Sequence, residues 1–153
     1  MEKVNENGVD TTVNTESVIT NSHLVELNVC FQQLLNVAEN MNGKFIYALH
    51  KNMTSLKPHI DALNASRTHC ITKYAKLDSK GNPKTKKDES GKKAFIYEKG
   101  DEQKALEEFQ GILAEPVDIT FHKVDTETFY SVENLNPKTI ASLGLFIDLI
   151  VND

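Results

Sequence analysis

The chain has 153 residues, of which 39% are hydrophobic and 25% are charged, and its formal net charge is −5. This length suits one domain with a sizeable core, and the composition excludes collagen-like and disordered chains. No apolar run reaches the roughly 20 residues that a membrane span needs, and the first residues lack the basic and apolar segments of a signal peptide, so no membrane partner is expected.

Basic residues are concentrated in the middle of the chain. Twelve of them lie between positions 44 and 93 against four acidic residues, whereas both flanking parts are acidic. Such a basic section can bind an anion or the acidic surface of another copy of the same chain. Self-association needs no additional partner, so we expect a homo-oligomer. The basic residues are Lys44, Lys51, Lys57, Arg67, Lys73, Lys76, Lys80, Lys84, Lys86, Lys87, Lys92 and Lys93.

Residues 1–21 are polar and form a predicted N-terminal arm, either disordered or adding an edge strand on assembly. From 23 to 41, apolar residues recur at helical spacing and predict an amphipathic helix with Ser22 as its N-cap. Asn42 and Gly43 tolerate positive φ and are expected to close that helix. The apolar positions are Leu24, Leu27, Phe31, Leu34, Leu35 and Ala38.

A second amphipathic helix is predicted over 44–77, with Pro58 inside it. Proline removes a backbone donor and crowds the preceding turn, so we expect a kink or a short break there. A tight connection between two amphipathic helices predicts an antiparallel helical hairpin over about 23–77.

The remainder is predicted to be a small α+β portion. Residues 78–93 form a basic loop or the tip of a small hairpin, and 94–100 form a strand. A third helix follows over 101–115, with Leu106, Phe109 and Leu113 facing inward. Residues 117–124 alternate like a half-buried strand. Asn136 and Pro137 open a last helix through Ile150, with Ile140 on its apolar side. The fold class is therefore a mostly helical α+β domain over 22–153, with a small antiparallel sheet and two shorter helices beside the hairpin.

The candidate binding residues lie near the end of the second helix. Arg67 projects onto the apolar side, where it must extend outward along its methylenes, pair with a carboxylate, or bind an anion such as phosphate. His69, Lys73 and Lys76 share the exposed face. We predict that Arg67, His69, Lys73 and Lys76 contact an anionic ligand, with no cofactor.

Enzymatic chemistry is not expected. His69 and Cys70 are adjacent on a helix and diverge by about 100°, and the histidines lack the spacing that would converge metal ligands. Cys30 and Cys70 are predicted to be free thiols in a reducing compartment. Tyr47 lies near lysines, but aromatic residues are not interleaved with the basic ones. We therefore interpret the lysines as a solvated face and expect no nucleic-acid partner.

The order of three segments resembles a group of small uncharacterised proteins of tailed bacteriophages and prophages. These segments are "ALNASRTHCITKYAKLDSKGNP", "AFIYEKGDEQKALEEFQGILAEPVDITFHKV" and "NLNPKTIASLGLFID", and the resemblance covers roughly residues 24–150. It implies a phage accessory protein in the host cytoplasm or the virion. Its role would be a virion or assembly component, or a host-defence antagonist contacting a phage or host protein. The alternative is a sponge that sequesters an anionic nucleotide signal between subunits.

Overall fold

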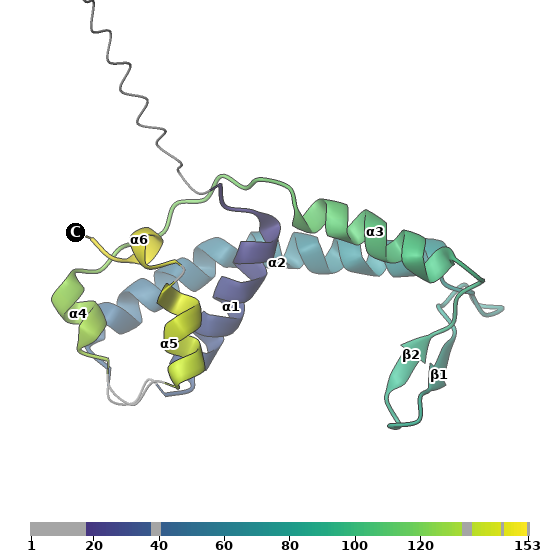
Figure 1. The fold of residues 1–153 in the computed structure, drawn as a ribbon, viewed down its shortest axis with the longest axis horizontal. Helices are drawn as coiled ribbons and strands as arrows, with labels where there is room; N and C mark the ends of the chain where they lie inside the picture. The colour runs from purple at the N-terminus through teal and green to yellow at the C-terminus, as the bar shows by residue number, and fades with distance from the viewer. Residues whose placement is uncertain (1–17, 38–40, 133–135, 145, 153) are drawn as a thin grey trace, which may run out of the picture.

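The computed structural model describes residues 18–37, 41–132, 136–144 and 146–152. Within these residues, six helices and one two-stranded sheet confirm a mostly helical α+β fold (Figure 1). No helix among them is both long and apolar enough to cross a membrane. Residues 1–17 of the predicted arm and the predicted core position Ala38 lie outside the described residues. The elements are α1 (Asn21–Leu35), α2 (Gly43–Tyr74), β1 (Thr85–Lys87), β2 (Lys93–Phe95), α3 (Asp101–Leu113), α4 (Thr126–Tyr130), α5 (Pro137–Gly144) and α6 (Ile147–Ile150).

The first helix, α1, buries the apolar stripe that its spacing predicts. Leu24, Leu27, Phe31 and Leu34 are each at most 1% exposed, because residues three and four apart fall on one helix face. The predicted N-cap was wrong. Thr20, not Ser22, precedes the helix, and its backbone N–H donates to His23 Nδ1 at 3.1 Å.

The long helix α2 begins at a cap, Asn42, that was predicted to end the preceding helix. Asn42 Oδ1 accepts a hydrogen bond from Lys44 N at 2.8 Å, and Asn42 has a φ of −58°. Asn42 therefore opens α2, and the prediction that it closes the preceding helix with positive φ was wrong. The helix then continues through Pro58 for 32 residues without a break. Pro58 is exposed, while Leu56 and Leu63 on either side of it are buried, so packing holds the helix across the proline.

The main core lies between α1 and the N-terminal half of α2, and it includes segment 121–124, α5 and α6. We call this part the head. Phe31 of α1 meets Phe121 edge to face, with ring centroids 6.3 Å apart. The core residues are Leu24, Leu27, Cys30, Phe31, Leu34, Phe45, Ala48, Leu49, Leu56, Phe121, Val124, Leu143, Phe146, Ile150 and Val151.

A second packing layer, which we call the stalk, forms where α3 returns along the C-terminal half of α2 (Figure 1). Cys70 and Ala105 are buried there, outside the main core. Leu106 was predicted to face inward but is 48% exposed. The adjacent Ala105 is buried instead, at 7% exposed, and Leu106 turns toward solvent.

Segment 117–124 is extended but is not a strand, so that prediction was wrong. Its burial alternates as predicted up to His122, and within the described residues it forms one isolated bridge, between Val124 and Val151. In this described part of the chain, its backbone contacts with other extended chain are confined to its two ends, where Val117 N donates to Ile19 O and Asn152 N donates to Val124 O. A buried side chain from α2 takes the place of a strand partner. Asn52 Nδ2 donates to His122 O at 3.0 Å, and His122 N donates to Asn52 Oδ1 at 2.6 Å.

The predicted last helix consists of two helices, α5 and α6, with Phe146 as the N-cap of α6. Asn136 Oδ1 accepts from Lys138 N at 2.8 Å, which confirms the predicted cap. Leu143 is fully buried, but Ile140 is 52% exposed, contrary to prediction. The short helix α4 was not predicted; its cap is Asp125, discussed below.

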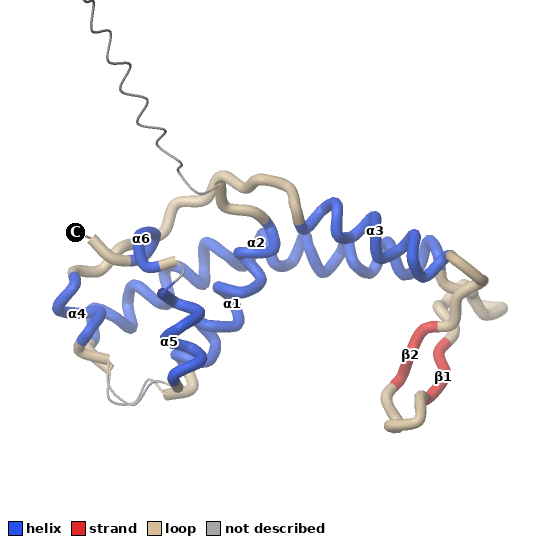
Figure 2. The backbone as a smooth tube through the Cα atoms, in the orientation of Figure 1, coloured by secondary structure: helices blue, strands red, loops and turns tan. Residues whose placement is uncertain are grey.

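The molecule is elongated. The tube in Figure 2 shows β1 and β2 at the end of the stalk, away from the head. Helix α2 extends from the head through the stalk, so the residues at its two ends belong to separate surfaces.

Candidate functional site

The basic segment 78–93 belongs to a β hairpin, the second of the two structures that the sequence left open. Thr85 pairs with Phe95 and Lys87 with Lys93 in an antiparallel register. We call residues 78–95 the lysine hairpin. Both strands are largely in solvent, with Ala94 alone partly buried among the strand residues. Its exposed cations are Lys80, Lys84, Lys86, Lys87, Lys92 and Lys93.

Two aspartates of the lysine hairpin are used inside its turns. Asp88 Oδ1 accepts from Ser90 Oγ at 2.7 Å and from the N–H groups of Ser90 and Lys92 at 2.9 Å each. These bonds hold the pKa of Asp88 below its ordinary value. Asp78 accepts from the N–H groups of Asn82 and Lys80, which lowers its pKa likewise. Both carboxylates therefore shape the turns.

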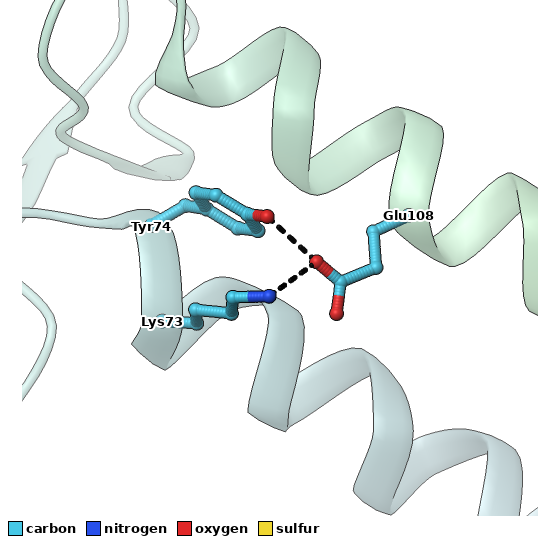
Figure 3. A network of polar contacts seen from close by, with 3 residues as sticks. All are labelled: Lys73, Tyr74 and Glu108. Atoms are coloured by element: carbon cyan, nitrogen blue, oxygen red, sulfur yellow. Dashed lines mark hydrogen bonds and ion pairs between the residues drawn. The ribbon is translucent and has the colours of Figure 1, made fainter.

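A polar network joins the C-terminal end of α2, which leads into the lysine hairpin, to α3 (Figure 3). Glu108 Oε2 accepts from Lys73 Nζ at 2.8 Å and from the Tyr74 hydroxyl at 2.7 Å. The bonds from Lys73 and then Tyr74 lower the pKa of Glu108, and the same contact with Glu108 raises the pKa of Lys73. Lys76 forms a further ion pair with Glu98 at 2.9 Å.

The four predicted anion-binding residues occupy different surroundings. Lys73 and Lys76 each face a carboxylate of this chain, and His69 lies exposed near enough to Glu108 to favour its charged form. Arg67 is exposed at the wall of a groove of about 280 Å³ between α2, α3 and β2. The structure does not gather the four into one pocket, and an anion site made by all of them stays a prediction.

The groove beside Arg67 is mainly apolar. Phe95 and Leu106 line it and are 39% and 48% exposed, and Cys70 lies at its floor. Tyr97 also lines it, and burial raises the pKa of this tyrosine, with Glu102 adding to the rise and Arg67 opposing it. The groove can therefore accept an apolar group next to a cation.

Cysteine and histidine side chains do not converge at this end of α2. Cys70 is 2% exposed, whereas the adjacent His69 is in solvent, so the two diverge as predicted. Burial raises the pKa of Cys30, which disfavours its thiolate. Across the described ranges, no group of three or more His, Cys, Asp or Glu residues is placed to hold a metal ion.

Glu98 and Glu108 were missed as partners of the basic residues. Lys73 and Glu108 are 35 positions apart, so no local pattern in the sequence pairs them. A pocket at the start of α2, around Tyr47 and His122, was also missed. The nearness of Tyr47 to lysines was the available signal, but the contribution of segment 122–125 depends on the tertiary fold.

In comparisons with known proteins, no family model, no curated protein and no solved structure matches the chain.

Proposed function

We propose that the protein acts by binding rather than by catalysis, and that the lysine hairpin docks on an acidic surface of another copy of the chain. The observation that carries this proposal is the exposure of the lysine hairpin, in which β1 is entirely in solvent and β2 nearly so. An isolated two-stranded hairpin is marginally stable in water. A partner that covers one face would supply the burial that the hairpin lacks.

The charges of the chain support a second copy as the partner. Residues 94–153 contain twelve acidic residues against four basic ones, opposite in sign to the lysine hairpin. Exposed carboxylates lie on α3 and just after it, at Glu102, Glu107, Glu115 and Asp118. Opposite charges on two patches steer association and fix its orientation. Two different patches can pair reciprocally in a twofold dimer, or one after another in a ring or an open chain of subunits.

The test is the oligomeric state as a function of salt. Light scattering coupled to size exclusion should show an oligomer at low ionic strength that dissociates as salt screens the charges. The double variant Lys86→Glu/Lys93→Glu should be monomeric at low salt. The control Lys57→Glu/Lys138→Glu has the same change in net charge in the head and should still associate. The proposal is contradicted if the wild type is a monomer at every salt concentration. It is also contradicted if both double variants lose association to the same extent.

The resemblance to tailed-phage proteins supports an accessory role, as a virion or assembly component or as a host-defence antagonist. A self-associating protein fits the first role directly. Mass spectrometry of purified particles tests it: detection at stoichiometric levels supports a virion component, and absence excludes that role.

Sequestration of a nucleotide signal between subunits is the second candidate. Arg67 favours it, because within the described residues no ion pair engages its guanidinium and a groove lies beside it. Lys73 and Lys76 support it less, since an anion would compete there with Glu108 and Glu98. A ligand bound only by the folded state raises thermal stability. A nucleotide-dependent rise in Tm that Arg67→Ala abolishes would support this function; no rise with any nucleotide would exclude it.

A further inference from the structure

A second pocket lies at the opposite end of α2 from the lysine hairpin. It has a volume of about 440 Å³ and is formed by the first turns of α2, by residues 122–125, by Thr128 of α4 and by Asn152. This volume falls within the roughly 300–1,000 Å³ of small-molecule sites. It differs from the Arg67 groove in its lining, which includes two lysines, whereas Arg67 is the one lysine or arginine among the described residues that lines the groove.

The lining of this pocket is positively charged. Lys44 and Lys123 face one carboxylate, Asp125. Asp125 Oδ1 accepts from Thr128 N at 2.7 Å, which caps α4 and lowers the pKa of Asp125. In the described part of the chain, no ion pair engages Lys44 or Lys123, whereas four other lysines are paired. Asp125 is ionised and attracts Lys44, but the two lysines outnumber this one carboxylate, and the net positive charge of the lining favours an anionic ligand.

An aromatic ring stands in the same wall. Tyr47 is 56% exposed and meets the His122 ring edge to face, with centroids 5.5 Å apart and an interplanar angle of 84°. Lys51 Nζ lies 5.9 Å from the Tyr47 centroid. An exposed ring is a platform on which a nucleic-acid base stacks, and nearby cations reinforce the contact.

We infer that this pocket binds a nucleotide, with the phosphate between Lys44 and Lys123 and the base stacked on Tyr47. The backbone N–H groups at the start of α2 add positive potential next to Lys44. Asn52 supports the pocket from behind by holding the backbone of His122. The phosphate and the base can belong to a free mononucleotide or to one nucleotide of a single-stranded nucleic acid. This site uses no residue of the lysine hairpin and does not depend on its proposed role.

The test is calorimetric titration of the full chain with adenosine monophosphate, adenosine, inorganic phosphate and a single-stranded octadeoxythymidylate. Adenosine monophosphate should bind, and adenosine or phosphate alone should bind about tenfold more weakly. In the NMR spectrum, the backbone amide chemical shifts of Tyr47, His122 and Lys123 should change when adenosine monophosphate is added. Preference for the octamer, with affinity falling steeply with salt, identifies a strand as the source; preference for the mononucleotide identifies the free ligand.

Variants separate the contacts. The substitutions Tyr47→Leu and Lys123→Ala should each lower the affinity for adenosine monophosphate about tenfold. Tyr130→Leu is the matched control, because Tyr130 is 69% exposed and lies outside the pocket. The Lys86→Glu/Lys93→Glu variant should bind like the wild type, which distinguishes this site from the lysine hairpin. The inference is overturned if neither nucleotide probe binds at millimolar concentration. It is also overturned if the chemical-shift changes are centred on Arg67, or if Tyr130→Leu loses as much affinity as Tyr47→Leu.

Discussion

Replacing Asn52 by alanine tests how the extended segment 117–124 is held. Asn52 is 3% exposed, and its amide makes two hydrogen bonds with the backbone of His122, at 3.0 and 2.6 Å. Each such bond contributes about 1 kcal/mol net, and a backbone group left without a partner costs more than the bond is worth. We expect Asn52→Ala to lower the free energy of unfolding by about 2–3 kcal/mol and Tm by about 5–10 °C for a chain of this size.

Urea unfolding followed by far-UV circular dichroism measures this change. Asn64→Ala is the control, because Asn64 lies exposed in the same helix and its side chain makes no hydrogen bond among the described residues. A difference between the two variants smaller than about 0.5 kcal/mol would refute the reasoning, since Asn52 would then not anchor the segment.

Three further changes test the packing and the polar network. Leu56 is fully buried, so Leu56→Ala should cost about 3–5 kcal/mol in urea unfolding, while Leu106→Ala should cost less than about 1 kcal/mol; similar losses would contradict the assigned core. Gly111 lies inside α3 with open space where a Cβ would be, so Gly111→Ala should raise the free energy of unfolding by about 0.5–1 kcal/mol. Gly100 has a φ of 88°, so Gly100→Ala should lower it by about 1 kcal/mol. Changes of the same sign in both variants would be inconsistent with these conformations. The lowered pKa of Glu108 means that its carboxylate stabilises the fold above its ordinary pKa and that this contribution is lost as pH falls through the lowered value. The difference in unfolding free energy between wild type and Glu108→Gln should therefore shrink on acidification, and a constant difference would rule out the network.

Helix content could be predicted because its signal is local. The spacing of Leu24, Leu27 and Phe31 reports one buried face whatever that face meets. The alternation in segment 117–124 also reported one-sided burial correctly, but it does not reveal whether a strand lies alongside. The sheet was therefore expected where a helix side chain, Asn52, satisfies the backbone instead.

The sequence could not predict how α3 and α5 are rotated about their own axes. Leu106 and Ile140 fit the apolar face of their helices, yet both are about half exposed, because contacts with other helices decide which side turns inward. The same limit applies to the site. Lys73 could be identified as exposed and basic, but its carboxylate partner Glu108 comes from another helix, and only the folded arrangement shows that its charge is already matched.

The uninterrupted run of α2 through Pro58 sets a distance within the protein. At 1.5 Å per residue, its 32 residues extend about 48 Å. A mononucleotide seated near Tyr47 is thus too small to touch the lysine hairpin, and the two surfaces can be occupied at once without collision. Under the two proposals above, one subunit would hold a small anion at one end of α2 and contact its neighbour at the other end, with α2 and the α3 helix packed on it joining the two surfaces.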